Sequence, residues 1–148
     1  RNGGFSEKVW SSIMKRTEAR ELLFTLLYEA QFSDPDNFDE IYRTELRCRE
    51  IEDDEYVRRV FYGIGEKLSE IDDIIECHAN GWKSGRLSKV TCAILRLCIY
   101  ELKYEKDIPM NVSLNEAVEL AKKYGEDKAA GFINGILNCI AHEIVTDD

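Results

Sequence analysis

The stretch from Val112 to Leu137 constrains the fold of this chain most, because it predicts two consecutive helices with defined ends. Ser113 and Glu116 have the spacing of a capping box, in which each side chain satisfies a free backbone N–H at a helix start. Gly125 stands where a left-handed residue would end that helix. The sequence therefore predicts a helix that begins at about Ser113 and ends before Gly125.

The second of these helices carries Asn134 and Gly135 inside an otherwise apolar run. A glycine inside a helix costs about 1 kcal/mol relative to alanine. We therefore expect another backbone to approach closely at Gly135, which would offset this loss.

Apolar residues recur at helical spacing through most of the remaining chain. They predict helices over about residues 15–32, 38–49 and 55–68, a short one to about 78 that is capped by Ser69, and one around 87–102. A turn at Ser33–Asn37 and a loop at Asn80–Gly85 separate them, and we expect this loop to divide two subdomains that share one core. No segment alternates as a strand does, so the predicted fold is all-α with about seven helices.

The length of 148 residues fits a single domain with one substantial core. We interpret residues 1–13 as a disordered extension, or a remnant upstream of a natural start at Met14, and residues 14–148 as the helical domain. No apolar run approaches the roughly 20 residues that span a bilayer, and the N-terminus lacks the apolar core of a signal peptide. Five cysteines without CxxC pairing favour a reducing, cytoplasmic location.

The sequence predicts no metal site, no cofactor and no catalytic residue. Cys77 and His78 form an adjacent pair, but no second pair stands at the spacing of metal ligands. Cys139 and His142 lie three residues apart without an accompanying acid or oxyanion motif. These residues are more simply structural or surface positions, so we do not expect an enzyme.

The net charge of −9 argues against nucleic-acid binding across the whole surface, but the charge is unevenly distributed. Residues 1–28 carry five basic and three acidic side chains, whereas the rest carries fifteen basic and twenty-six acidic ones. Lys15, Arg16 and Arg20 lie within one and a half helical turns and form a plausible phosphate-contacting edge. A solvated face, tempered by neighbouring glutamates, is the alternative interpretation.

Tyr28, Tyr124 and Phe132 offer rings on which unpaired bases could stack, although single aromatics at helical spacing more often belong to a core. Lys128 would add a cation at the same edge if the first and last helices are neighbours. Arg96 stands in an apolar stretch, and we expect it to be structural, paired with an acid such as Glu101 or Glu116.

The sequence resembles the NusB family of transcription antitermination factors over almost its whole length, from Lys15 to about Ile144. The residues that carry the resemblance are Ala19-Arg20-Glu21, Leu27-Tyr28-Glu29-Ala30-Gln31, Phe61-Tyr62-Gly63-Ile64, Trp82, Arg86-Leu87, Ala93-Ile94-Leu95-Arg96-Leu97, Tyr100-Glu101-Leu102, Asp107-Ile108-Pro109, Asn115-Glu116-Ala117-Val118-Glu119-Leu120-Ala121-Lys122 and Phe132-Ile133-Asn134-Gly135. Two features depart from the family pattern. Thr17 and Glu18 dilute the basic opening, and Thr91-Cys92 replaces an acidic–basic pair.

The resemblance implies an all-helical fold of two three-helix subdomains without enzymatic activity. It also implies pairing with the ribosomal small-subunit protein NusE, with which the family holds the single-stranded boxA RNA of ribosomal-RNA leader transcripts. Such a complex acts on RNA polymerase. A homodimer is a further possible state.

Carried over residue by residue, the resemblance implies two surfaces. The RNA surface would comprise Lys15, Arg16, Arg20, Tyr28, Lys128 and Phe132. The partner surface would lie around the fifth helix, at Ser88, Thr91 and Leu95. Two alternatives stay open: the RNA-recruiting domain of an RNA methyltransferase, and a helical module that binds only proteins.

Overall fold

A computed structural model describes the backbone of residues 2–79 and 87–147, and the side chains of residues 16–79 and 87–145. Within these ranges the chain is all-α, as predicted, and contains no strand. The helices are α1 (Asn2–Ala30), α2 (Phe38–Arg49), α3 (Glu55–Glu66), α4 (Leu68–His78), α5 (Lys89–Tyr104), α6 (Met110–Tyr124) and α7 (Ala129–Asp147), with one 3-10 turn, η1 (Pro35–Asn37). The predicted loop at Asn80–Gly85, with Trp82 and Arg86, lies outside the described residues.

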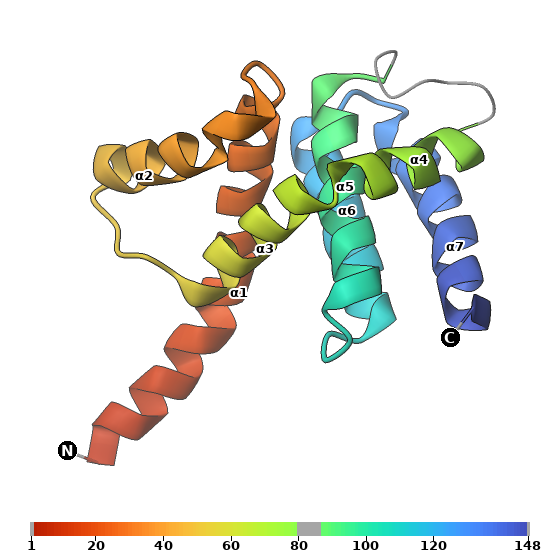
Figure 1. Ribbon diagram of the computed structural model, residues 1–148. Coiled ribbons are helices and arrows are strands. Elements are labelled where there is room, and N and C mark those ends of the chain that lie inside the picture. The colour runs from red at the N-terminus through yellow and green to blue at the C-terminus, as the bar shows by residue number, and fades with distance from the viewer. Residues whose placement is uncertain (1, 80–86, 148) are drawn as a thin grey trace.

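Helix α5 is the centre of the fold. It packs against α1, α3, α4, α6 and α7, and every residue from Thr91 to Leu102 except Arg96 is buried. A helix that is apolar nearly all round must be covered on all sides. Helices α1 to α3 lie on one side of α5, while α6 and α7 run alongside it on the other (Figure 1).

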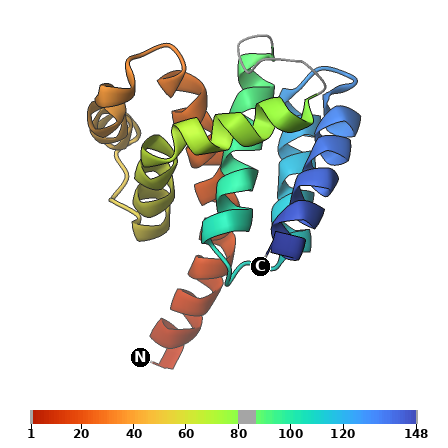
Figure 2. The same ribbon diagram turned by 45° about the vertical axis from the view of Figure 1, so that its right-hand side comes forward.

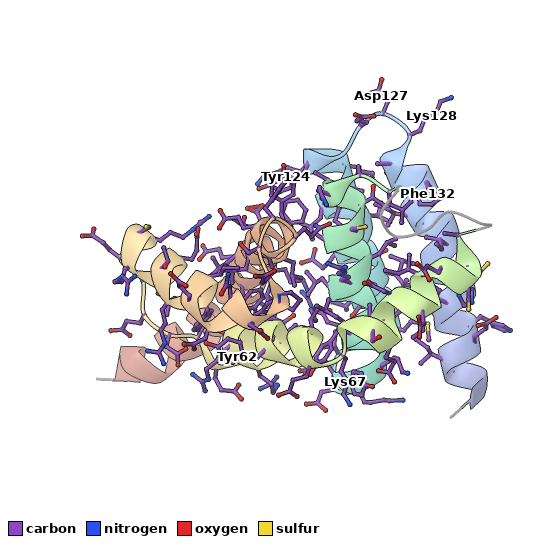
Figure 3. All side chains as sticks on the ribbon, turned by 45° about the horizontal axis from the view of Figure 1, so that its top comes forward. Tyr62, Lys67, Tyr124, Asp127, Lys128 and Phe132 are labelled. Atoms are coloured by element: carbon purple, nitrogen blue, oxygen red, sulfur yellow. The ribbon has the colours of Figure 1, made fainter. Side chains whose placement is uncertain are left out.

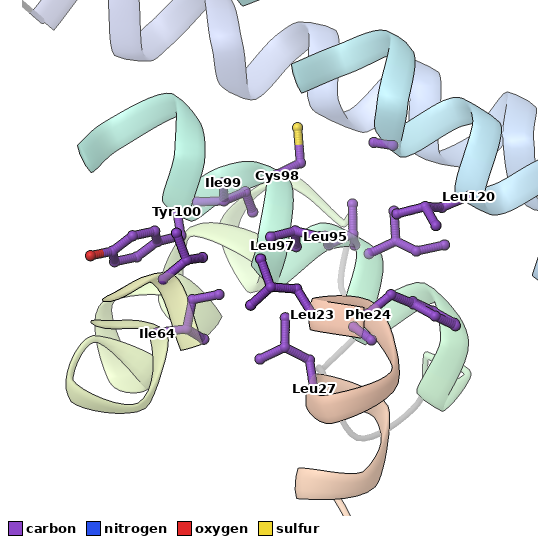
Figure 4. Packing of buried hydrophobic residues seen from close by; sticks show 14 of the residues in the cluster. Leu23, Phe24, Leu27, Ile64, Leu95, Leu97, Cys98, Ile99, Tyr100 and Leu120 are labelled. Carbon is purple, nitrogen blue, oxygen red and sulfur yellow. The ribbon is translucent and has the colours of Figure 1, made fainter. Parts of the chain in front are cut away.

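Two groups of helices therefore share one core. Leu23 and Leu27 of α1 and Ile64 of α3 gather around α5, and Leu120 of α6 closes the other side (Figure 4). Helix α4 crosses between the groups and contacts α3, α5 and α7, whereas α5, α6 and α7 stand side by side (Figure 2). None of the described helices is long and apolar enough to cross a membrane.

Helix α1 starts far earlier than the sequence indicated. It is helical from Asn2, through the residues 2–13 for which we predicted a disordered extension, and its first part extends away from the other helices (Figure 1). No proline interrupts this stretch, and its only glycines, Gly3 and Gly4, stand at the very start of the helix. The domain boundary at residue 14 stays a prediction.

The predicted capping box is wrong. Helix α6 starts at Met110 with Pro109 as its N-cap, three residues before Ser113, so Ser113 and Glu116 lie inside the helix. Both side chains have buried partners instead, because Ser113 Oγ donates to Glu101 (2.8 Å) and Glu116 accepts from Arg20 (3.3 Å). The predicted cap at Ser69 is also wrong, since α4 begins at Leu68.

The two glycine predictions fail for different reasons. Gly125 ends α6 in an extended conformation (φ −90°, ψ 172°) rather than a left-handed one. Its lack of a side chain matters for space, because a Cβ there would lie 2.7 Å from the Ala121 carbonyl oxygen and from the Ala129 Cβ. At Gly135, by contrast, a Cβ would meet no described heavy atom within 4 Å apart from its chain neighbours and the backbone of its own helix, so no other backbone approaches there.

Candidate nucleic-acid interface

One end of the helical body carries a row of aromatic rings along α1. Phe24, Tyr28 and Phe32 follow one another at intervals of one turn, with centroids 6.4 Å and then 5.4 Å apart. Tyr124, at the end of α6, stacks on Phe24 with centroids 4.8 Å apart. Phe24 is buried and Tyr28 partly so, while Tyr124 and Phe32 are exposed, so the row leads from the core to the surface.

Beside this row an open hollow of about 790 Å³ lies between the start of α5 and the connection from α6 to α7. Lys128 and Phe132 line it, and both are exposed. Figure 3 shows Lys128, Asp127, Phe132 and Tyr124 at the same end of the molecule. Glu126 and Asp127 also line the hollow, so the positive charge of Lys128 is opposed by two carboxylates.

The structure thus brings together some of the predicted residues. Lys128 and Phe132, predicted to bind RNA, share the hollow with Ser88 and Thr91, predicted to bind a partner. Tyr28 does not line the hollow, but the end of its helix is tied to the start of α5, because Gln31 Nε2, just after α1, donates to the Lys89 carbonyl (2.7 Å). A polyanion at this end would meet exposed aromatic surface and a lysine at once.

Arg20, by contrast, is not part of an exposed edge. It is 4% exposed, and its guanidinium donates to the Glu101 carboxylate from Nε at 3.0 Å and to Glu116 from Nη1 at 3.3 Å. Burial alone would lower the pKa of Arg20, but Glu101, with smaller contributions from Tyr56 and Glu116, compensates for it, and the pKa is raised. The expectation that Arg20 faces RNA phosphates is therefore corrected: its guanidinium is buried and pairs with two carboxylates in the interior.

The partner of Arg20 belongs to a buried polar cluster that we call the Glu101 network. The Glu101 carboxylate, 2% exposed, accepts hydrogen bonds from Arg20, from the Tyr56 hydroxyl and from Ser113 Oγ. Burial and then the Glu101 charge raise the pKa of Tyr56 well above its usual value, so the phenol stays protonated and keeps donating. The network joins α1, α3, α5 and α6, and each buried group in it has a partner.

Arg16 lies near this network as well. Its guanidinium stands over the Tyr56 ring, 3.8 Å from the centroid, and the side chain is partly buried. Arg16 precedes Tyr28 by twelve residues, or about 18 Å along the helix. The basic start of α1 is thus distant from the end of the same helix that adjoins the hollow, and the Lys15 side chain lies outside the described residues.

The predicted partner surface is only partly exposed. Ser88 is exposed and caps α5 by accepting from the Thr91 N–H (3.1 Å). Thr91 is 7% exposed and Leu95 is fully buried in the core. Since a helix covered on all sides has no outward face there, Leu95 is corrected to a core residue.

Arg96 has a different partner from the one expected. It forms a two-pronged ion pair with Asp72 of α4, at 3.0 Å and 2.9 Å, instead of pairing with Glu101 or Glu116. Those carboxylates are taken by Arg20, which the sequence placed on the surface. The helical spacing of apolar residues places both Arg20 and Arg96 on helices. It does not indicate which of the two side chains points into the core.

Lys123 is a cation at this end that the sequence reasoning missed. Its ammonium stands 5.3 Å from the Tyr124 ring centroid and pairs with Glu21 of α1, which also accepts from the Tyr124 hydroxyl (3.3 Å). Lys123 directly precedes Tyr124, one of the rings on which bases could stack, and this position in the sequence could have identified it. Among the described residues no group of three His, Cys, Asp or Glu side chains could hold a metal ion.

The fold and the open surface together define a small helical binding protein built of two packed groups of helices. The sequence model of the NusB family matches residues 17–142. The transcription antitermination protein NusB of Agathobacter rectalis is 42% identical over 127 residues, which cover 84% of this chain and 97% of that protein. The chain therefore belongs to the NusB family, which confirms the resemblance.

Solved structures agree with this assignment. NusB of T. maritima matches with a TM-score of 0.72 and 38% identity, covering 86% of this chain and 91% of that one. The crystal structure of the antitermination factors NusB and NusE in complex with dsRNA contains a chain that matches with a TM-score of 0.77 and 30% identity, covering 86% and 96%. Both likenesses extend over nearly the whole fold.

Proposed function

We propose that the protein is an RNA-binding transcription antitermination factor that acts by binding rather than by catalysis, in the cytoplasm. It pairs with NusE to hold the boxA RNA of ribosomal-RNA leader transcripts and thereby modifies RNA polymerase. Family membership supports this function, as does the structure of a relative in which NusB and NusE are complexed with dsRNA. The observation that carries it is the hollow in which Lys128 and Phe132 stand exposed beside the start of α5.

In this proposal, Tyr28, Lys128 and Phe132 contact the RNA directly. The aromatic rings stack on unpaired bases, which tolerates many sequences because every base has a π-face, and Lys128 neutralises a phosphate. Lys15 and Arg16 extend the contact along α1, where the Arg16 guanidinium stands over the Tyr56 ring. Arg20 positions α1 through the Glu101 network and does not touch RNA.

NusE covers the Ser88 side of the same hollow. RNA and NusE would then bind to adjacent parts of one surface and contact each other there. Because Glu126 and Asp127 offset Lys128 and the net charge is −9, RNA alone is held weakly. A second protein that adds cations beside the hollow would supply the missing affinity, which explains why the function requires a pair.

The test is the binding of fluorescently labelled boxA-type single-stranded RNA to the purified protein, measured by anisotropy with and without NusE. We expect weak binding alone, clear strengthening with NusE and weakening with rising salt. Replacing both Lys128 and Phe132 with alanine should weaken binding, with stacking alone contributing about 1–3 kcal/mol per base.

Matched controls are Arg43→Ala and Ile51→Ala, which remove an exposed cation and an exposed apolar side chain outside the proposed surface. Both should bind RNA as the unaltered protein does. A protein that shows no mutual enhancement with NusE, or a double variant that binds as well as these controls, would refute the proposed function.

A further inference from the structure

We propose that Phe32 and Lys89 form one more nucleotide-binding position, which takes an unpaired base and its phosphate next to the hollow. This inference rests on the proposed function, since it extends the same RNA path across the end of α1. Neither residue was predicted to bind RNA, and neither is needed by the core: Phe32 follows the last residue of α1, and Lys89 is the first residue of α5.

Phe32 is 64% exposed, more than any other large apolar side chain in the described part of the chain. Its ring meets Tyr28 edge-on, with centroids 5.4 Å apart and planes at 64°. Because Tyr28 meets the ring edge-on, the contact leaves ring surface uncovered. Phe32 therefore continues the aromatic row outward by one ring, at the spacing of one helical turn, and offers a platform for stacking.

Lys89 supplies the charge. Its ammonium lies 5.6 Å from the Phe32 ring centroid, and no carboxylate pairs with it among the residues that the structure describes. The first turn of α5 contains no acidic residue, so the free N–H groups and the lysine present the same sign. A phosphate beside a base on Phe32 would meet this positive end.

A hydrogen bond from a side chain to the backbone holds the two segments together. Gln31 Nε2 donates to the Lys89 carbonyl at 2.7 Å, which ties the end of α1 to the start of α5. Lys89 directly follows Ser88, which lines the hollow with Lys128 and Phe132. The position is thus continuous with the proposed RNA surface, and this continuity, together with the unpaired lysine, favours RNA over an apolar protein segment as its occupant.

The experiment uses the complete chain with NusE and labelled boxA-type RNA. Phe32→Ala should weaken binding about tenfold, as loss of one stacked base does. Phe32→Leu should weaken it similarly, because it keeps apolar bulk but loses the ring, and Phe32→Trp should restore it. Since the side chain is largely exposed, thermal unfolding should be unchanged in all three variants. Lys89→Met should lower the salt dependence of binding.

RNAs shortened one nucleotide at a time distinguish a direct contact. The effect of Phe32→Ala should vanish when the nucleotide that stacks there is removed, while the effect of Phe132→Ala persists. If the unaltered protein and the Phe132→Ala variant behave as proposed but Phe32→Ala binds every RNA normally, this inference alone is overturned. If Phe32→Ala instead weakens NusE binding in the absence of RNA and leaves RNA binding intact, the position belongs to the partner and the inference is equally wrong.

Discussion

The Glu101 network and the open hollow both combine basic, aromatic and acidic side chains, but the network is buried and the hollow is exposed. In the network, Arg20, Tyr56 and Ser113 all donate to one buried carboxylate, and each of these buried groups has a partner inside the fold. In the hollow, Lys128 and Phe132 stand exposed beside two carboxylates. The comparison teaches that a basic residue near a functional surface contributes to binding only when the fold has not already given it a partner.

The difference also separates stability from function. The network joins four helices across the two subdomains, so its loss should destabilise the protein strongly. The hollow lies at an exposed end between the start of α5 and a connection, so its side chains can change without disturbing the core. The following variants test whether these two regions are as independent as their contacts indicate.

The largest effect is expected for Glu101→Ala. It leaves the buried guanidinium of Arg20 with only the part-exposed Glu116 as a partner, and breaking a buried ion pair in this way costs about 3–5 kcal/mol. Equilibrium urea unfolding measures the change. As a control, Glu119→Ala removes a carboxylate whose 3.8 Å pair with Lys122 is exposed, and its effect should stay within about 1 kcal/mol. Equal effects of the two substitutions would show that the network does not hold the subdomains together.

A pair of glycine substitutions extends the comparison to the backbone. In Gly63→Ala the added Cβ would clash with the Tyr100 side chain, and such overpacking costs about 1–3 kcal/mol. In Gly135→Ala the Cβ meets open space, so the variant should gain roughly 1 kcal/mol from helix propensity. Thermal unfolding of both variants checks the opposite signs. A loss at Gly135 would reveal a packing contact at the outer face of α7.

The helix pattern could be predicted well because it depends on local spacing. The bounds of α2 at Phe38 and Arg49 agree with the sequence, since an apolar stripe and a proline-containing turn define them. The start of α6 could not be predicted in the same way. Ser113 and Glu116 have the spacing of a capping box. In the fold, however, Ser113 hydrogen-bonds to Glu101 of α5 and Glu116 to Arg20 of α1.

The candidate surface was predictable only in part, for the same reason. Lys128 stands in the connection from α6 to α7 and Phe132 in the first turn of α7, and the structure brings them together in the hollow. Arg20 and Leu95 were assigned to surfaces although both are buried. Their burial depends on how α1 and α5 are oriented toward each other across the core. The spacing of apolar residues along a single helix carries no information about that orientation.

Salt dependence gives a smaller and more specific test of the hollow. Lys128→Met should reduce the slope of log K against log salt concentration by about 0.7, the value for one phosphate contact on single-stranded nucleic acid. Anisotropy titrations at several salt concentrations measure the slope with NusE present. Arg43→Met, which removes an exposed cation from α2, should leave the slope unchanged. If both variants lower it equally, the attraction is general rather than localised at the hollow.

The smallest effect concerns Glu21, which joins the two regions because it stands on α1 one residue after Arg20 but contacts Lys123 and Tyr124 at the exposed end. Glu21→Gln should change stability by less than about 1 kcal/mol, since this ion pair is exposed. It should strengthen RNA binding about twofold at low salt, because it removes one negative charge about 10 Å along α1 from Tyr28, and the gain should disappear at high salt. Glu119→Gln supplies the control for net charge alone. If Glu21→Gln gains no more than this control, the RNA does not pass Lys123, and the path is confined to α1, α5 and the start of α7.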